Sequence, residues 1–245
     1  MDELLRRARI AWAGYAGLGG GFRPGQVHLG INAGSGLCPP GWAGIVVLGD
    51  AAIVTAPDTC AERELRRALR GVPVARLTDP SVVVPAGGGA AILGPANLAF
   101  TDPARFTRPG ASPWSATQEM PVTDQRMQRL LSSVSAEDAA ETDLARIDSP
   151  VHVVLDGDRA VAAAGYLTWP GRVAHLSVLT DTACRGRGLA KLAGAAATAD
   201  ALARGLLPQW RARVPASVRA GASLGFVSCG SQLSIRLRCP DADLG

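Results

Sequence analysis

One segment of the sequence, residues 174–205, constrains the fold more than any other. It begins with the apolar run HLSVLT, which is typical of a β-strand, and ends with an alanine-rich run closed by Gly205, which is typical of an α-helix. Arg185-Gly186-Arg187-Gly188 lies between them. Glycines allow a tight turn and the close approach of a bulky group. Because the first amides of a helix have no partners within it and its dipole adds positive potential, this turn predicts an anion site suited to a diphosphate.

The remainder of the second half has the regular pattern of an α/β domain. Strands are predicted at residues 151–155, 160–168 and 173–180, with turns at Asp156-Gly157-Asp158 and Trp169-Pro170-Gly171. After the helix, the pattern predicts a strand at 206–214, a short helix that begins at Pro215, and a last strand at 226–238. Two helices are expected before residue 150, the second from Ser135.

The first half is less regular, and we expect a smaller α/β domain there. VVLGDAAIVTA predicts a hairpin around Gly49-Asp50, and it resembles VVLDGDRAVAAA near residue 157. An internal duplication and a shared hairpin composition explain this similarity equally well. The expected division is an accessory or degenerate domain at 1–115, a second domain at 116–239, and a tail at 240–245.

Composition excludes several classes of protein. Hydrophobic residues make up 47% of the 245 residues and charged residues 19%, which is typical of a folded chain rather than a disordered one. The uncharged stretches 24–49 and 81–101 are broken by Gly and Pro, so neither predicts a membrane span. The net charge of +4 suits an anionic small ligand, and the dispersed charges and 4% aromatic content do not favour nucleic acid binding.

The cysteines and the amino-terminal residues suggest a compartment. The five cysteines are widely spaced and form no CxxC pair, so we expect neither a disulfide framework nor a zinc site. The start MDELLRRARIAW has no apolar core of signal-peptide length. These features together predict a reducing, cytoplasmic environment.

Two well-known phosphate motifs do not fit the glycine-rich turn. No GxxxxGK[ST] is present, and GxGxxG is absent after the 173–180 strand. The run Arg185-Gly186-Arg187-Gly188-Leu189-Ala190 instead matches [Q/R]-x-x-G-x-[G/A]. Val-Leu-Thr-Asp precedes it, and Leu224-Gly225-Phe226 follows downstream. With these motifs, residues 122–238 resemble the GNAT superfamily of acyl-CoA-dependent N-acyltransferases.

The resemblance implies a fold and a cofactor site. The fold would be a mixed, mostly antiparallel central sheet flanked by helices. Acetyl-CoA would be the co-substrate, with its pantetheine arm paired to a strand end, its diphosphate on the glycine turn, and a short-helix serine nearby. The residues implied are Val178, Leu179, Thr180, Arg185, Gly186, Arg187, Gly188, Leu189, Ala190, Lys191 and Ser217.

The same resemblance leaves the catalytic residues unknown. Gly221 stands where this family commonly has a tyrosine acid, and Ala174 stands where it commonly has a carboxylate. Tyr166 and His175 are the candidate substitutes, although each fits a packing role as well. Three acidic residues, Glu119, Glu137 and Glu141, lie where the family often forms its acceptor site, and solvated helix charges explain them too. Cys184, beside the glycine turn, suits packing rather than nucleophilic attack, and His28 and His152 have no ligand-like neighbours in the sequence.

Two functions remain open from the sequence. The first is an N-acetyltransferase that transfers an acetyl group from acetyl-CoA to a primary amine by direct attack in a ternary complex. The acceptor would be a small-molecule amine or a peptide, with no nucleic acid or membrane partner and no metal, and the family allows a homodimer. The second is a non-catalytic acyl-CoA-binding regulatory module, which the residues Gly221 and Ala174 favour.

Overall fold

The chain folds into two compact units. The structure, a computed structural model, describes residues 2–83, 91–110, 114, 117–135 and 142–237. Unit 1 consists of Met1–Leu98 and Ser228–Gly245, and unit 2 of Ala99–Val227. This division does not coincide with the expected one at residues 115/116, because the last strand of the expected second domain lies in unit 1. The expected tail at 240–245 lies outside the described residues.

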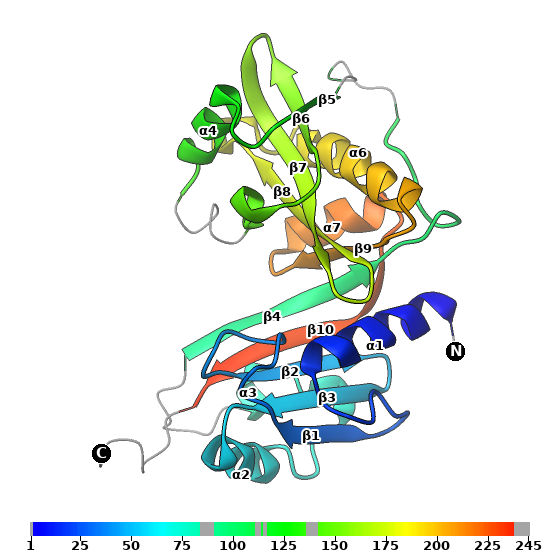
Figure 1. The fold of residues 1–245 in the computed structure, drawn as a ribbon, viewed down its shortest axis with the longest axis vertical. Helices are drawn as coiled ribbons and strands as arrows, with labels where there is room; N and C mark the ends of the chain where they lie inside the picture. Colours follow the sequence, from blue (N-terminus) through cyan, green and yellow to red (C-terminus); the bar gives the residue numbers. More distant parts are fainter. Residues whose placement is uncertain (1, 84–90, 111–113, 115–116, 136–141, 238–245) are drawn as a thin grey trace. The chain divides into compact units, whose positions relative to one another are not determined.

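Unit 1 is built on five strands in the order β1-β3-β2-β10-β4 (Figure 1). Their bounds are β1 Val27–Ile31, β2 Ala43–Leu48, β3 Ala51–Ala56, β4 Ala91–Phe100 and β10 Val227–Arg236. The helical segments are α1 Glu3–Ala16, α2 Thr59–Ala68, η1 Val74–Arg76 and α3 Pro80–Val83. β10 pairs antiparallel with β2, and β1 pairs parallel with β3. The carboxy-terminal strand thus completes the sheet begun by the amino-terminal hairpin.

Local signals explain much of unit 1. The predicted hairpin is present, with Gly49 at φ +61° in the turn between β2 and β3. Asp2 and Asp58 cap α1 and α2 through side-chain oxygens that accept backbone N–H groups. Every residue of β2 and β3 is buried, so this hairpin forms the centre of the unit 1 core. Whether the hairpin reflects an internal duplication stays a prediction.

Unit 2 carries five further strands in the order β9-β8-β7-β6-β5. Their bounds are β5 Thr117–Met120, β6 Val151–Asp156, β7 Arg159–Trp169, β8 Val173–Thr180 and β9 Leu207–Ala212. The helical segments are α4 Gln125–Ser132, η2 Leu144–Arg146, η3 Thr182–Cys184, α6 Leu189–Ala203 and α7 Pro215–Ser223. Neighbouring strands from β5 to β8 are antiparallel, and β8 and β9 are parallel. This is the mixed, mostly antiparallel sheet flanked by helices that was predicted.

The two faces of this sheet bury separate cores. Alternate side chains of β7 and β8 point to opposite faces. On one face Tyr166, Ala174 and Leu176 pack with the alanines of α6. On the other, Ala163 and Leu179 pack with residues of α4 and η2. The sheet is therefore covered on both sides, and the ends of its strands are where a ligand can reach it.

Some expectations for the fold were wrong. Residues 27–31 form β1 within the uncharged stretch 24–49, although glycine and proline interrupt that stretch, and residues 80–83 form the short helix α3. Cys60 is disulfide-bonded, although no disulfide framework was expected, whereas Cys38, Cys184 and Cys229 are free. Most of the second helix expected after Ser135 lies outside the described residues.

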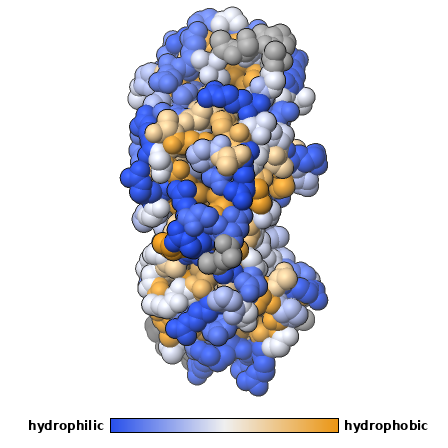
Figure 2. Space-filling model, turned by 90° about the vertical axis from the view of Figure 1, so that its right-hand side faces the viewer, coloured by the Kyte–Doolittle hydropathy of each residue, from blue (hydrophilic) through white to orange (hydrophobic). Residues whose placement is uncertain are grey.

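Figure 2 shows one face of the molecular surface. On the face shown in Figure 2, hydrophilic residues surround scattered apolar ones, as on most folded proteins. None of the helices in the described part of the chain combines the length and the apolar character needed to cross a membrane.

Candidate acyl-CoA site

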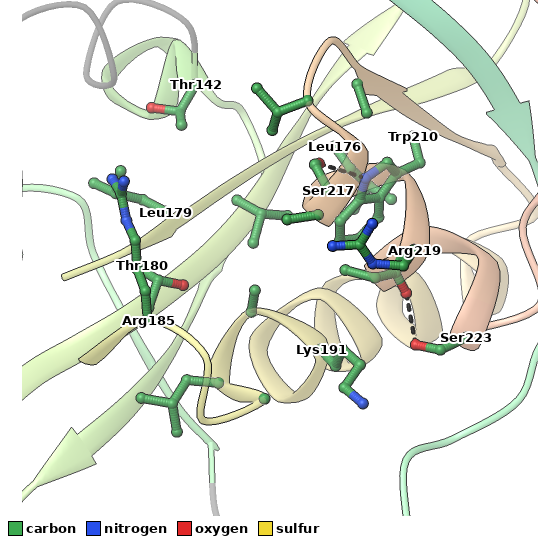
Figure 3. Close-up of a pocket in the computed structure, with 18 of the residues that line it drawn as sticks. Thr142, Leu176, Leu179, Thr180, Arg185, Lys191, Trp210, Ser217, Arg219 and Ser223 are labelled. Atoms are coloured by element: carbon green, nitrogen blue, oxygen red, sulfur yellow. Dashed lines mark hydrogen bonds between the residues drawn. The ribbon is translucent and has the colours of Figure 1, made fainter. Parts of the chain in front are cut away.

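A cavity of about 590 Å³ lies within unit 2, between the carboxy-terminal parts of β8 and β9. Figure 3 shows Leu179, Thr180 and Arg185 on one side of it and Trp210, Ser217 and Arg219 on the other. Its floor continues to the start of α6. Ten of the eleven predicted cofactor residues line it: Val178, Leu179, Thr180, Arg185, Gly186, Gly188, Leu189, Ala190, Lys191 and Ser217.

The cavity exists because two parallel strands separate. β8 pairs with β9 only through Val173, Ala174 and His175. Beyond that point β8 continues to Thr180 and β9 to Ala212, and the residues on both sides of the gap line the cavity. The edge of β8 that faces the gap is therefore open to an extended ligand, which can add to it as a further strand does.

The glycine turn brings the start of α6 to this cavity. Gly186 and Gly188 both have φ +79°, a left-handed conformation that glycine adopts without strain. A β-carbon on Gly186 would meet nothing within 4 Å, so the backbone is open there. Gly188 is the N-cap of α6, and the first turn of this helix, Leu189 to Leu192, contains no acidic residue. The positive end of the helix is thus available to an anion.

Asp181 shapes the loop between β8 and the glycine turn. Its carboxylate accepts the N–H of Ala183 at 2.9 Å and pairs with Arg159 at 2.5 Å. Burial would raise the pKa of this carboxyl, but hydrogen bonds from Arg159 and Ser133 outweigh it and hold the pKa below its usual range. A charged, buried Asp181 therefore fixes the loop that leads into Arg185.

The residues present fit an acyl-CoA. Five cations from α6, β9, α7 and the loops beside them line the cavity, namely Arg185, Lys191, Arg211, Arg213 and Arg219. They suit the phosphates of CoA, as the start of α6 does. The Thr180 hydroxyl oxygen is buried and has no hydrogen-bond partner among the described residues. A polar ligand along the β8 edge can supply that partner.

Trp210 of β9 fills the space beside α6 and α7. A β-carbon on Gly194 would lie 2.8 Å from its ring, and one on Gly221 would lie 2.9 Å from it. The indole N–H donates to the hydroxyl oxygen of Ser217 at 3.0 Å. Gly221, where the resemblance implied a tyrosine, therefore has no room for a side chain beside the tryptophan ring.

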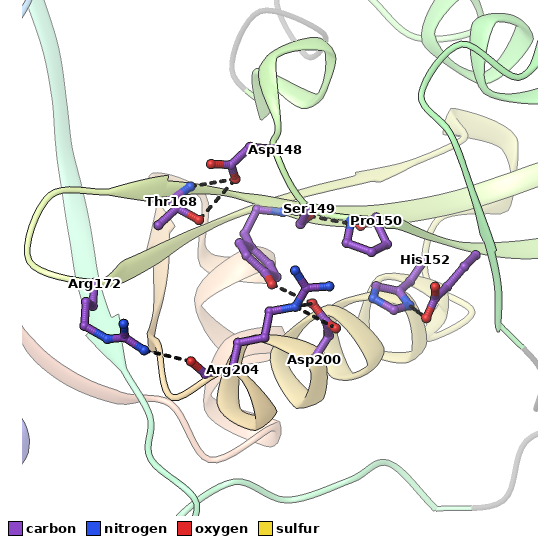
Figure 4. A network of polar contacts seen from close by, with 10 residues as sticks. Asp148, Ser149, Pro150, His152, Thr168, Arg172, Asp200 and Arg204 are labelled. Atoms are coloured by element: carbon purple, nitrogen blue, oxygen red, sulfur yellow. Dashed lines mark hydrogen bonds and ion pairs between the residues drawn. The ribbon is translucent and has the colours of Figure 1, made fainter.

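Both candidate catalytic residues lie away from this cavity. Tyr166 is 1% exposed and donates to the Asp200 carboxylate at 2.5 Å, and Arg204 also pairs with Asp200 (Figure 4). Burial and the hydrogen bond to Asp200 raise the pKa of Tyr166. Neither Tyr166 nor His175 lines the cavity, so nothing in this arrangement supports a direct role for them.

His175 packs on the opposite face of β8 from Ala174, because side chains alternate along a strand. Its ring stacks on Trp169 at 4.2 Å between centroids, and its Nδ1 lies 3.0 Å from the Gln209 amide nitrogen. Burial, with a smaller contribution from Arg211, lowers the pKa of His175 to about 3. The histidine is therefore neutral and held by its neighbours.

The other singled-out residues are scattered. Arg187 is exposed at the glycine turn and does not line the cavity, whereas the free Cys184 is buried and does line it.

The remaining acidic residues and histidines lie elsewhere. Glu119 lies on β5, where its carboxylate is 4.0 Å from His152, and His28 lies on β1. Ala174 is fully buried. Glu137 and Glu141 lie outside the described residues. Among the residues that are described, no three potential metal ligands come together.

Sequence reasoning missed Trp210 and the arginines of β9 and α7. Two glycines inside helices, Gly194 and Gly221, were a usable signal for the tryptophan. A glycine costs a helix up to about 1 kcal/mol relative to alanine, so it often marks close packing. Nothing local in the sequence marks Arg211 or Arg219 as cavity residues.

Comparisons with known proteins agree with this geometry. The family model for GNAT acetyltransferase matches residues 152–231, which run from β6 into β10. No curated protein matches the chain. A GCN5-related N-acetyltransferase from Kribbella flavida has a TM-score of 0.50 at 16% identity, over 78% of this chain and 88% of that one. At this identity the likeness concerns the fold.

Two further solved structures are similar at lower scores. A putative GNAT-family acetyltransferase from Novosphingobium aromaticivorans has a TM-score of 0.45 at 21% identity, over 60% of this chain and 66% of its own. A GNAT-family acetyltransferase from Colwellia psychrerythraea has a TM-score of 0.47 at 12% identity, over 75% of each chain. Residues 152–231 thus match the GNAT acetyltransferase family, a family of acyltransferases.

Proposed function

We propose that the chain is an N-acetyltransferase that transfers an acetyl group from acetyl-CoA to a primary amine. The observation that carries this proposal is the cavity between the diverging ends of β8 and β9. It continues to the start of α6, where no side chain caps the first backbone N–H groups. An open strand edge and an anion-binding helix start, joined in one cavity, suit a long ligand with a diphosphate at one end.

Each part of the cavity then has a role. The backbone of residues 185–191 and the cations Arg185 and Lys191 bind the phosphates. Val178, Leu179 and Thr180 hold the pantetheine arm along β8. The thioester lies in the gap toward Trp210 and Ser217, where backbone N–H groups at the strand ends can polarise its carbonyl.

The proposed reaction is direct attack in a ternary complex. A neutral primary amine attacks the thioester carbonyl carbon, the C–S bond breaks, and the amine loses a proton. The acceptor is a small-molecule amine or a peptide. A cytoplasmic location and a homodimer stay predictions.

A second candidate is a non-catalytic acyl-CoA-binding module. It is favoured by a specific observation: Tyr166 and His175 are held by neighbours outside the cavity, and Gly221 packs under Trp210. Release of CoA from acetyl-CoA in the presence of amines separates the two functions, because only the enzyme turns over.

Thermal unfolding with and without saturating acetyl-CoA tests both. Ligand at about 100 times its dissociation constant adds about 2.7 kcal/mol, or on the order of 5–10 °C for a chain of this size. Gly188→Trp should abolish the shift, because the new side chain fills the helix start. The matched control is Gly157→Trp, in the β6–β7 turn, where φ is +59° and a β-carbon meets nothing within 4 Å.

The outcomes are distinct. A shift in wild type and Gly157→Trp that is lost in Gly188→Trp supports acyl-CoA binding at the glycine turn, and a subsequent screen of amines for CoA release identifies the enzyme. The absence of any shift in folded wild type would refute both functions.

A further inference from the structure

We infer that the Ser217 hydroxyl, oriented by Trp210, donates a hydrogen bond to the sulfur of the departing CoA. It would do so in place of the tyrosine that the resemblance implied at position 221, where this chain has a glycine. The inference rests on the proposed acyl transfer. It assigns a catalytic residue for which neither the family motif nor the comparisons provide one.

The direction of one hydrogen bond carries the argument. An indole nitrogen only donates, so in the 3.0 Å contact between Trp210 Nε1 and Ser217 Oγ the serine oxygen must accept. The serine proton is then left for another acceptor. Because Ser217 lines the cavity and Trp210 is 4% exposed, that acceptor is a ligand in the cavity or water.

The rigidity of Trp210 keeps the hydroxyl in place. The ring is enclosed between Gly194 of α6 and Gly221 of α7, each of which would clash with it if it carried a β-carbon. The ring also packs edge-on against Phe226, with centroids 5.5 Å apart. Its N–H therefore has a fixed direction, and the Ser217 oxygen is fixed with it.

Ser217 also lies where negative charge is favoured. It belongs to the first turn of α7, which begins at Pro215, and the positive end of the helix dipole acts there. Arg219, from the same helix, lines the cavity as well. A thiolate that forms beside this turn is stabilised by the dipole, the cation and the hydroxyl together.

The step balances in atoms and charge. The amine nitrogen bonds to the thioester carbon, and when the C–S bond breaks its electron pair stays on sulfur. The Ser217 O–H donates a hydrogen bond to that sulfur and keeps its proton. The proton lost by the amine passes to solvent, and the CoA thiolate later takes one up from solvent.

Titration of enzyme-bound CoA tests the inference without any acceptor. The thiolate of CoA absorbs in the ultraviolet, so its pKa can be measured in the complex. We expect Ser217→Ala to raise this pKa by about one to two units, the size expected for one hydrogen bond to a charged acceptor. kcat for acetyl transfer should fall about tenfold or more. Ser217→Thr keeps the hydroxyl and should restore both values toward wild type.

Two more variants separate this role from packing. Ser223 lines the same cavity on the same helix, but its hydroxyl already donates to the Ala220 carbonyl at 2.8 Å. Ser223→Ala should therefore leave the pKa of bound CoA unchanged. Trp210→Phe removes the orienting N–H together with part of the ring but keeps the Ser217 hydroxyl, so it should give a smaller rise in this pKa than Ser217→Ala. Melting temperatures of all variants show that each is folded.

The possible failures are distinguishable. If CoA binds wild type and Ser217→Ala with the same thiol pKa, the role of Ser217 is refuted and the proposed acyl transfer stands. If Ser217→Thr behaves like Ser217→Ala, the effect comes from shape and the role is again refuted. If CoA does not bind wild type, both proposals fail together.

Discussion

The indole of Trp210 lies against the backbone of Gly221, so that a β-carbon on that glycine would be 2.9 Å from the indole Cγ. Contacts this short do not occur between a real β-carbon and its neighbours. The tryptophan on β9 and the glycine on α7 therefore form one packing unit, and neither can be changed alone without cost.

Gly221→Ala should destabilise unit 2, although alanine is the better helix former. A helical glycine replaced by alanine gains up to about 1 kcal/mol where there is room. Here the new methyl group must displace the indole, and overpacking of this kind costs about 1–3 kcal/mol. We expect a net loss in the free energy of unfolding, measured in urea, with a change in tryptophan fluorescence.

The matched control for this variant is Gly14→Ala in α1. A β-carbon there would meet nothing within 4 Å, so the substitution should stabilise by a few tenths to about 1 kcal/mol. If Gly221→Ala were as stabilising as Gly14→Ala, the close packing of Trp210 would be wrong.

Gly225→Ala should be more damaging. Gly225, in the Leu-Gly-Phe motif, has φ +83°, and a β-carbon there would overlap the carbonyl of Arg105. The left-handed conformation alone costs a non-glycine residue about 1–2 kcal/mol, and the overlap with backbone adds about 1–3 kcal/mol. Urea unfolding should show a loss of about 2–5 kcal/mol.

Gly157→Ala separates the two parts of that loss. Gly157 has φ +59°, but a β-carbon there would meet no atom within 4 Å. Its substitution therefore carries only the cost of the left-handed conformation, about 1–2 kcal/mol, without a clash against backbone. Equal losses for the two variants would mean that the Arg105 backbone does not constrain the motif glycine.

The sequence predicted the cofactor side of the site well, because its signals are local. The apolar run of β8, the turn at Gly186 and Gly188 and the helix α6 follow one another in the chain, so composition and spacing alone predict their arrangement. The register of β8 and β9 ends at His175 and Gln209, and neither strand's own sequence predicts where it ends.

What the sequence did not predict depends on contacts between distant segments. β10 pairs with β2, almost two hundred residues earlier, where Leu233 lies opposite Ile45. β1 is short, partly exposed and contains Gly30, so it has little of the alternation that marks a strand. The packing of the Trp210 ring of β9 against Gly221 of α7 could not be predicted from either segment alone.

Tyr166→Phe should reduce stability and leave acetyl transfer nearly unchanged. The Tyr166 hydroxyl donates to the Asp200 carboxylate at 2.5 Å in a buried position, and hydrogen bonds to charged groups contribute about 1.5–3 kcal/mol. Because Tyr166 does not line the cavity, CoA release should continue at close to the wild-type rate. A large fall in kcat without loss of stability would restore Tyr166 as a catalytic residue.

His175 should make stability depend on pH. Its pKa is lowered to about 3, chiefly by burial, whereas in the unfolded chain it is near 6.5. Between these values the unfolded state binds a proton that the folded state does not, so stability is full above pH 6.5 and falls as the pH is lowered. The loss is at most about 1.4 kcal/mol per pH unit, and less because the side chain is only partly buried.

His175→Gln should flatten this dependence. A glutamine oxygen can still accept the Gln209 amide, so the variant loses the stacking on Trp169 and the titration but keeps the hydrogen bond. Urea unfolding between about pH 7 and pH 5, above the range in which carboxylates titrate, should give a smaller slope for the variant than for wild type. Parallel slopes would show that His175 is protonated in the folded chain as easily as in the unfolded one, and it would then again be available as a base.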